Sequence, residues 1–233
     1  MYPRIKRLLD FVSALILLFL LAPIQLLIAS FIWLTMGRPI LFQQIRPGFC
    51  ERPFRCVKFR TMNEARDEQG CLLDDAHRLT WLGKLLRRTS LDELPQLWNV
   101  LRGELSLVGP RPLMERYLPY YTEVERRRHA VRPGLTGWAQ INGRNRLSFD
   151  KRLEMDVWYV EHLSFWLDLR ILMASVWIVL SQRGVAEDTI ALDESRRSTS
   201  EPTREVSRTN KLRHPGAPSD DRGGFYEEPT ESL

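Results

Sequence analysis

Cysteine and histidine are scarce in this chain of 233 residues, and their spacing indicates no metal site. The three cysteines, Cys50, Cys56 and Cys71, form no C-x-x-C pair and have no histidine array nearby, so we expect neither a zinc site nor a disulfide framework. The four histidines lack H-x-x-x-H spacing and are assigned no chemistry. We expect the cysteines to be reduced thiols that face the cytoplasm.

Internal repeats and nucleic-acid-binding motifs are also missing from the sequence. Aromatic residues are not interleaved regularly with basic ones, as they are in single-strand-binding surfaces. Charge is nevertheless uneven, because residues 1–185 carry 27 Lys and Arg against 18 Asp and Glu, whereas residues 186–233 carry 7 against 11. The basic part is expected to attract anionic lipid headgroups, nucleotides or nucleic acid, and charge alone does not choose among them.

The length of the chain fits one folded domain with a tail and is too short for two full cores. From about residue 186 the composition changes to Ser, Thr, Pro, Arg and Glu, with few large apolar residues to bury. We therefore predict a membrane segment over 1–38, a single folded domain over 39–185 and a disordered tail over 186–233.

The first segment contains an uncharged run of 26 residues, from Phe11 to Met36. As a helix this run would reach about 39 Å, which exceeds the hydrocarbon core of a bilayer, about 30 Å. It is too long for the apolar region of a cleaved signal peptide, so we expect it to stay in the mature protein. Pro23 removes a backbone hydrogen bond at mid-run, and basic residues flank both ends. A re-entrant helix-break-helix and a kinked spanning helix therefore both remain open.

A second apolar stretch runs from Leu163 to Leu180 and is interrupted by Asp168 and Arg170. Its uncharged part is too short to span a bilayer. An amphipathic helix in the headgroup plane and a helix packed in the core are both open interpretations.

The residues between these two stretches predict an α+β fold that is mostly helical. Ile40–Met62 alternates apolar and basic residues around a Pro-Gly pair, which indicates two short strands joined by a turn. Gly134 and Gly137 are expected to set turns. The basic triplet Arg126–Arg128 is typical of a solvated helix end. Helices are predicted over 76–86, 91–101, 117–130 and 150–162.

The most informative stretch runs from Arg87 to Pro112 and places two adjacent acids, Asp92 and Glu93, between arginine-bearing segments. One interpretation of this arrangement is phosphate chemistry. The acidic pair would supply a nucleophile and a metal ligand or base, and the flanking arginines would hold the anionic oxygens of a phosphoryl group.

The other interpretation of the same residues is an ordinary helix start. Ser90 as N-cap and Glu93 at the third helical position match a capping box, and Pro95 is tolerated in a first turn. Under either interpretation the positive end of the helix would favour an ionised Asp92 and a bound phosphate.

Taken together, the motifs resemble those of the bacterial sugar transferase family, the small monotopic phosphoglycosyl transferases that start lipid-linked glycan assembly. The resemblance covers roughly residues 3 to 183. It is carried, in order, by KRLLDF with the apolar run that follows it, KFRTM at 58–62, RRTSLDELPQLWNVLRGELSLVGPRP at 87–112, RPGLTGWAQINGRN at 132–145 and DVWYVEHLSFWLDLRIL at 156–172.

The resemblance implies a two-step, ping-pong transfer that passes through a covalent intermediate. Asp92 would attack the β-phosphate of a UDP-sugar and release UMP, and the resulting aspartyl phosphosugar would pass its phosphosugar to polyprenol (undecaprenyl) phosphate. The family also implies Mg²⁺, with Asp92, Glu93 and Asp156 as candidate ligands. Glu93 and Asp156 are alternatively candidates for acid-base chemistry.

Four basic residues are the candidates for holding substrate phosphates. Arg111 lies between two prolines that would keep its guanidinium ready for a phosphate. The other three are Lys58, Arg88 and Arg144.

The resemblance further implies a re-entrant membrane hairpin that breaks at a proline, often after serine. Here the break falls at Ala22 and Pro23, so the serine hydroxyl is absent. The catalytic domain is expected on the cytoplasmic face of the bacterial inner membrane, in contact with its lipid. The chain is expected to lack the extra N-terminal multi-span domain of the larger relatives. Downstream glycosyltransferases and a second copy of the chain are further candidate partners, and nucleic acid is not one.

A rival hypothesis from another class is a non-enzymatic, membrane-anchored basic module that binds anionic lipid or nucleic acid. It predicts that the function is indifferent to Asp92. A second rival is a transferase that acts on another nucleotide-linked group. Which sugar is transferred does not follow from these motifs, because they account for the shared phosphate and lipid chemistry.

Overall fold

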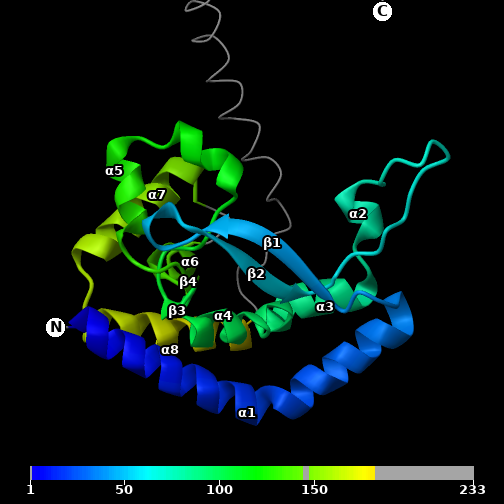
Figure 1. The fold of residues 1–233 in the computed structure, drawn as a ribbon, viewed down its shortest axis with the longest axis horizontal. Helices are drawn as coiled ribbons and strands as arrows, with labels where there is room; N and C mark the ends of the chain where they lie inside the picture. Colours follow the sequence, from blue (N-terminus) through cyan, green and yellow to red (C-terminus); the bar gives the residue numbers. More distant parts are fainter. Residues whose placement is uncertain (1, 144–146, 182–233) are drawn as a thin grey trace, which may run out of the picture. The chain divides into compact units, whose positions relative to one another are not determined.

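The computed structural model describes residues 2–143 and 147–181, so Arg144 and the predicted tail over 186–233 lie outside the described residues. The described part is mostly helical with two short strand pairs, consistent with the predicted α+β class (Figure 1). The α-helices are α1 (Tyr2–Met36), α2 (Asp75–Arg78), α3 (Trp81–Thr89), α4 (Gln96–Arg102), α5 (Glu123–Arg126), α6 (Trp138–Ile141), α7 (Phe149–Glu161) and α8 (Phe165–Ser181). The strands are β1 (Leu41–Pro47), β2 (Pro53–Phe59), β3 (Ser106–Val108) and β4 (Gly134–Thr136). Short 3₁₀ turns are η1 (Phe49–Glu51), η2 (Leu91–Glu93), η3 (Glu115–Tyr120) and η4 (Arg127–Ala130).

Helix α1 is 35 residues long and, by length and composition, could cross a membrane. It is one helix that bends, with Pro23 inside it (Figure 1). The predicted break at Ala22 and Pro23 is therefore a bend and not an interruption. A proline lacks the N–H that would bond the carbonyl four residues earlier, which is the usual cause of such a bend.

Both arms of α1 pack against the rest of the described fold. In the first arm, Ala14 is fully buried in a cluster with Cys56 and Leu97. In the second arm, Ile28 and Ile32 are buried against β2 and α3. The two halves of the helix therefore share one face of the fold, and the opposite face of the helix exposes most of its apolar side chains.

The first turn of α1 is fastened to α8 through one buried carboxylate. The Lys6 ammonium bonds Oδ2 of Asp168 at 2.7 Å, and the Tyr2 hydroxyl donates to the same oxygen. The Tyr159 hydroxyl donates to the other oxygen, Oδ1, at 2.6 Å. Asp168 is only 5% exposed, so three donors replace the water that this charge loses on burial. Asp168, which interrupts the second apolar stretch, therefore joins α1, α7 and α8.

Two further residues of the KRLLDF motif attach α1 to the elements above it. The Arg7 guanidinium donates to the carbonyls of Val100 and Leu101 at the end of α4, at 2.6 and 2.8 Å. Oδ1 of Asp10 accepts the backbone N–H of Leu107 in β3 at 3.1 Å. The charged residues of the motif thus hold α1 to the rest of the described fold.

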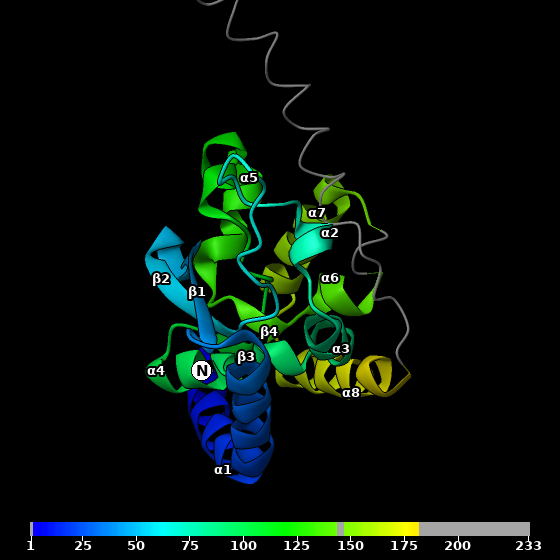
Figure 2. The ribbon, with the colours of Figure 1, turned by 90° about the vertical axis from the view of Figure 1, so that its right-hand side faces the viewer.

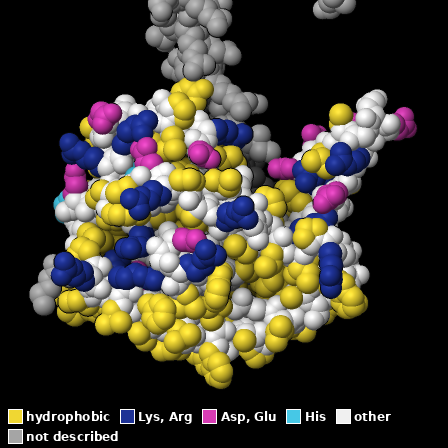
Figure 3. All heavy atoms as spheres, in the orientation of Figure 1, with side chains coloured by type: hydrophobic (Ala, Val, Ile, Leu, Met, Phe, Trp, Pro, Cys, Tyr) yellow, Lys and Arg dark blue, Asp and Glu magenta, His cyan; other side chains and the backbone are white. Residues whose placement is uncertain are grey.

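Helix α8, the second apolar stretch, is buried on one side, which confirms packing in the core, whereas its place in the headgroup plane stays a prediction. Ile171 is fully buried in a core cluster, whereas Trp166, Met173 and Trp177 are 74, 67 and 68% exposed. Figures 1 and 2 place α3, α4 and α8 nearest α1, with α5 and α7 on the far side of the domain. In Figure 3 apolar side chains gather along the edge that α1 forms, and Lys and Arg side chains lie above them.

The predicted hairpin within Ile40–Met62 is confirmed. Strands β1 and β2 are antiparallel, with Leu41 opposite Phe59 and Pro47 opposite Pro53. The alternation of side chains buries Phe54 and Cys56 on the face that packs on α1 and α4. Lys58 follows at the same spacing and carries a charge toward the neighbouring acidic turn.

Three of the predicted helices are shorter or more broken than their apolar spacing suggested. The helix over 76–86 splits into α2 and α3, because Thr80 caps α3 by accepting the N–H of Gly83. The helix over 117–130 divides into η3, α5 and η4, since Pro119 lies in η3 and Thr122 starts α5 with a capping box. The helix over 91–101 becomes η2 and α4. The helix over 150–162 corresponds to α7.

The segment between β2 and α3, which includes the short helix α2, has two ends that meet at Thr61. The carbonyl of Thr61 accepts two hydrogen bonds from Thr80, one from its backbone N–H at 3.3 Å and one from its side-chain hydroxyl at 3.2 Å. Met62 and Leu79 form a bridge, and a Cβ on Gly83 would lie 2.0 Å from the same carbonyl oxygen. Helix α3 therefore starts in direct contact with the end of β2.

Strands β3 and β4 form a parallel pair that depends on close contact between two glycines. A Cβ on Gly134 would lie 2.1 Å from the backbone nitrogen of Gly109. A Cβ on Gly137 would lie 2.2 Å from the Gly109 carbonyl oxygen. The expectation that Gly134 and Gly137 set turns is therefore wrong, because these positions need room and not an unusual backbone angle.

Replacing Gly134 with alanine should separate β3 from β4 and destabilise the fold by about 1–3 kcal/mol, because the added methyl has no space. Thermal unfolding of purified protein in one detergent would measure the loss. Gly70→Ala is the matched control, since its Cβ meets nothing within 4 Å and its cost comes only from a φ of +81°. Equal losses for the two variants would contradict the crowding argument.

Candidate active site

The acidic pair lies in η2, the single turn between α3 and α4. Ser90 ends α3 in a left-handed conformation, with φ 57° and ψ 17°, and its side chain makes no cap hydrogen bond. The predicted capping box is therefore wrong, since the Glu93 side chain does not return to the backbone of Ser90. Two cations hold it instead, and charge-assisted bonds are stronger than a bond to a neutral N–H.

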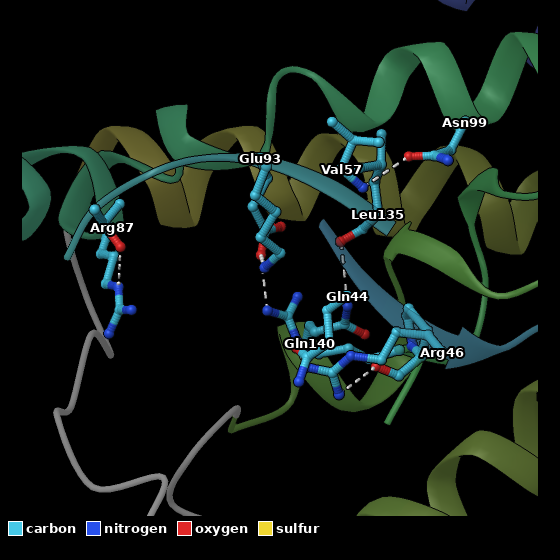
Figure 4. Close-up of polar contacts among 12 residues, drawn as sticks. Gln44, Arg46, Val57, Arg87, Glu93, Asn99, Leu135 and Gln140 are labelled. Carbon is cyan, nitrogen blue, oxygen red and sulfur yellow. Dashed lines mark hydrogen bonds and ion pairs between the residues drawn. The ribbon is translucent and has the colours of Figure 1, made fainter. Parts of the chain in front are cut away.

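Glu93 is clamped between a strand and a loop. Its Oε1 accepts from Nζ of Lys58 at 2.6 Å and from Nη2 of Arg111 at 2.7 Å (Figure 4). Burial raises the pKa of Glu93, but the charges of Arg111 and Lys58 outweigh it and hold that pKa below its ordinary value. Glu93 therefore stays ionised and fixes two of the predicted phosphate-binding residues in place.

Asp92 is buried and its carboxylate makes no hydrogen bond or ion pair within the described part of the chain; it is 7% exposed. Burial and then the neighbouring charge of Glu93 raise the pKa of Asp92 to about 6, although Lys58, Arg111 and Arg87 pull in the opposite direction. A carboxylate that is desolvated, surrounded by cations and without a bonded partner is suited to nucleophilic attack on an anionic substrate.

The expectation that a helix end favours an ionised Asp92 is not met. Helix α4 begins at Gln96, beyond the acidic turn. Burial dominates the electrostatics of Asp92 and shifts its pKa upward.

The arginines that precede the pair differ in their positions. The charge of Arg87 acts on Asp92, and its Nε donates to the Thr61 hydroxyl at 3.1 Å (Figure 4). Arg88 lies next to it at the end of α3 with an exposed side chain. Arg144 is outside the described residues. Of the four predicted phosphate-binding residues, the structure thus brings Lys58 and Arg111 together at Glu93.

The loop that carries Arg111 is supported from behind by a buried ion pair. Arg128 donates through Nη2 to Oδ2 of Asp156 at 2.6 Å and to the carbonyl of Arg111, also at 2.6 Å. Arg128 is 2% exposed, and Arg126 bonds both carboxylate oxygens of Glu51 at 2.7 Å. The interpretation of the triplet as a solvated helix end is therefore wrong for Arg128, which is buried in η4. Arg126, at the end of α5, is partly exposed and paired with Glu51.

The predicted metal ligands divide into two groups. Asp92 and Glu93 are adjacent in the chain. Mg²⁺ is usually bound by one or two carboxylates together with oxygens of the substrate, so this pair is a suitable set of donors. Asp156 is committed to Arg128, and the described residues contain no group of three acidic, thiol or imidazole side chains placed to hold a metal ion. The arrangement therefore fits a metal at Asp92 and Glu93, and it does not support Asp156 as a ligand.

Sequence reasoning missed two residues near Arg111. Arg46, at the end of β1, donates through Nη1 to the carbonyl of Pro112 at 3.5 Å. Arg152, on α7, lies one turn before Asp156. Neither stands out in the sequence, although the spacing of four between Arg152 and Asp156 places both on one helix face.

Comparison with known proteins gives a family match over most of the chain. A family model described as bacterial sugar transferase matches residues 1–182. The chain is similar to the uncharacterized sugar transferase EpsL of Bacillus subtilis, with 53% identity over 183 residues, which cover 78% of this chain and 91% of EpsL.

Two longer relatives have names that state a substrate. The chain is 38% identical to the UDP-galactose-lipid carrier transferase of Erwinia amylovora, over 77% of this chain and 41% of that protein. It is 40% identical to the UDP-glucose:undecaprenyl-phosphate glucose-1-phosphate transferase of Klebsiella pneumoniae, over 74% of this chain and 39% of that protein. The matched region is thus about two-fifths of these longer proteins.

Replacing Asp92 with asparagine should stabilise the protein at neutral pH. The folded pKa of Asp92, about 6, lies above its ordinary value of 3.8, so ionisation opposes folding above pH 6. The free energy of unfolding of the variant should therefore exceed that of the wild type by up to about 3 kcal/mol above pH 6. This difference should disappear below about pH 4. Denaturant unfolding from pH 4 to pH 8, in buffer with EDTA, would measure it.

The exposed carboxylate of Asp74 provides the control. Asp74→Asn should change the stability little at any of these pH values. A gain for Asp92→Asn that is the same at pH 4 and pH 8, or a loss at pH 8, would refute the argument.

Proposed function

Because the chain belongs to the bacterial sugar transferase family, we propose that it transfers a sugar-1-phosphate from a UDP-sugar to undecaprenyl phosphate. The products are a polyprenol diphosphate sugar and UMP, and the reaction is the first membrane step of a bacterial surface glycan. The proposal takes its donor and acceptor from the names of relatives that act on UDP-glucose and undecaprenyl phosphate.

One observation supports this chemistry more than any other. Asp92 is buried, lacks a hydrogen-bond partner among the described residues, and is subject to the charges of Lys58, Arg87 and Arg111. A carboxylate in a structural ion pair would be bonded to those cations. Here the cations bond Glu93 and Thr61, so the Asp92 carboxylate is not tied up in an ion pair and can act on a phosphorus atom placed against it.

In the proposed first step, a carboxylate oxygen of Asp92 attacks the β-phosphorus of the donor. The bond from this phosphorus to the bridging oxygen breaks, and UMP leaves with the electron pair. In the second step, an oxygen of polyprenol phosphate attacks the same phosphorus, and the Asp92 carboxylate is released. Lys58 and Arg111 lie where negative charge accumulates on the phosphoryl oxygens, which lowers the barrier of both steps.

The ionised Glu93 would hold Lys58 and Arg111 and, with Asp92, a divalent ion. Bound Mg²⁺ would neutralise charge on the diphosphate and on the acidic pair. Without such neutralisation, the negative charge of Glu93 disfavours a second negative charge at Asp92.

The proposal predicts that UMP release depends on Asp92. Wild-type protein with Mg²⁺ and polyprenol phosphate should release UMP from at least one of UDP-glucose, UDP-galactose and UDP-N-acetylgalactosamine. Asp92→Asn should lower the rate at least about 10³-fold, because an amide is not a nucleophile. Asp74→Asn should retain the wild-type rate. Product can be followed as UMP and as lipid-linked sugar by mass spectrometry.

Each contrary outcome points to a different hypothesis. Equal release by wild type and Asp92→Asn would move the nucleophile elsewhere. No release by folded wild-type protein from any donor would favour the non-enzymatic basic module, which should bind anionic vesicles equally well with either residue at position 92.

For the membrane segment, we propose a re-entrant helix that enters and leaves by the cytoplasmic face of the inner membrane. Both arms of α1 pack against the same domain, through Ala14 in one arm and Ile32 in the other. A helix that crossed the bilayer would carry one of these arms away from the domain. The exposed apolar residues of α8 and the basic residues above them suit the hydrocarbon boundary and the headgroups, respectively.

This topology predicts that both ends of α1 are reached from the same side. In a background without Cys50, Cys56 and Cys71, Arg4→Cys and Arg38→Cys replace exposed basic residues at the two ends. Both cysteines should react with an impermeant maleimide only after the cells are opened. Labelling of one of them in intact spheroplasts would show that α1 spans the membrane.

A further inference from the structure

Two arginines from different elements lie beside the segment that carries Arg111. Arg46, at the end of β1, donates to the Pro112 carbonyl at 3.5 Å and to Oε1 of Gln44 at 2.6 Å (Figure 4). These bonds hold the Arg46 guanidinium next to the Pro-Arg-Pro segment without neutralising its charge.

Arg152 approaches the same segment from α7. It is followed one turn later by Asp156, which binds Arg128, and Arg128 in turn donates to the Arg111 carbonyl. The Arg152 Nε donates to the carbonyl of Leu147 at 3.3 Å, while its Nη2 is buried and has no hydrogen-bond partner among the described residues. Arg152 and Asp156 form no ion pair, because Asp156 is bonded to Arg128 and acts on Arg152 only at longer range.

The carboxylates around Arg111 are already used by other cations. Oε1 of Glu93 serves Lys58 and Arg111, and Asp156 serves Arg128. In residues 2–143 and 147–181 no carboxylate pairs with Arg46 or Arg152. Burial, together with repulsion from Arg111, lowers the pKa of both guanidinium groups. The three arginines therefore concentrate positive charge that an anion would relieve.

We propose that Arg46 and Arg152, together with Arg111, form a second phosphate subsite that receives the α-phosphate of the nucleotide donor, the phosphate that leaves in UMP. The inference rests on the proposed function and extends it, because it assigns a place to the part of the diphosphate that does not react with Asp92. Guanidinium groups suit this task, since they bind phosphate oxygens in pairs and stay charged when buried.

The position of the subsite favours the soluble donor over the lipid acceptor. Helix α7 lies on the side of the domain that is far from α1, whereas α8, which follows it, lies next to α1 (Figures 1 and 2). The phosphate of a polyprenol would enter from the α1 side, because its chain stays in the membrane. A nucleotide from the cytoplasm has access from the α7 side.

The subsite would also assist the departure of UMP. When the bond between the β-phosphorus and the bridging oxygen breaks, the electron pair stays on the oxygen bound to the α-phosphorus. Cations already placed against that phosphate stabilise the charge that develops there. Arg46 and Arg152 should therefore affect both the binding of UMP and the rate of its release.

The test compares UMP with uridine, because only UMP carries the phosphate. Arg152→Gln and Arg46→Gln should each weaken UMP binding about tenfold by calorimetry. Neither should change the binding of uridine. In the transfer assay both variants should raise KM for the UDP-sugar and lower kcat, with KM for polyprenol phosphate unchanged. Arg152→Lys, which keeps the charge, should recover part of the UMP affinity.

Arg55→Gln is the matched control, because Arg55 is exposed on the same hairpin and lines a different cavity, on its outer face. It should bind UMP as the wild type does. Within the part of the chain that the structure describes, Arg152 makes a single hydrogen bond, to a backbone carbonyl, so its variant tests the proposal even if Arg46→Gln does not fold.

Three results would overturn the subsite. One is that Arg152→Gln binds UMP as tightly as the wild type does, in an assay in which the wild-type enzyme is active. This result would leave the proposed function intact. Another is an equal loss of uridine and UMP affinity. The third is a rise in KM for polyprenol phosphate alone, which would assign the arginines to the acceptor. Failure of the proposed function itself would instead appear as no UMP release by the wild type.

Discussion

A single carboxylate oxygen organises the candidate site. Oε1 of Glu93 receives both the Lys58 ammonium from β2 and the Arg111 guanidinium from the loop after β3. Since each cation is already bonded, neither closes on Asp92, and the second carboxylate of the pair stays available although it is surrounded by positive charge. The two adjacent acids thus have opposite electrostatic behaviour: the cations bonded to Glu93 lower its pKa, and burial raises the pKa of Asp92 to about 6. The sequence contains two acids of similar chemistry, and the fold makes them different.

The parts of the fold that local sequence determines were predictable. The hairpin followed from the alternation of apolar and basic residues in Ile40–Met62, and the helix predicted over 150–162 corresponds to α7. The capping box at Ser90 failed because its competitor, Lys58, is 35 residues away in the chain, and such a distant partner has no local signal. Arg46 was missed for the same reason. The acidic pair itself was found because two charges beside several arginines are conspicuous in any fold.

The N-terminal motif KRLLDF illustrates how the apolar helix α1 is joined to the rest of the described fold. Its charged residues do not face lipid headgroups: Lys6 and Asp10 bond Asp168 and the backbone of β3, and Arg7 bonds the end of α4. Helix α4 follows the acidic turn at its other end, so α1 is connected to the candidate site through the bonds of Arg7 and through α4.

The meeting of Thr61 with Thr80 has a practical consequence for protein engineering. Thr80 bonds the carbonyl of Thr61, so the two ends of the segment between these residues are held together by hydrogen bonds. Its ends stay together whatever its length, and the entropic cost of a longer loop grows only slowly. The exposed turn at Gly70 is therefore a suitable place to insert an affinity tag or a fluorescent reporter without disturbing the packing of α3 on β2.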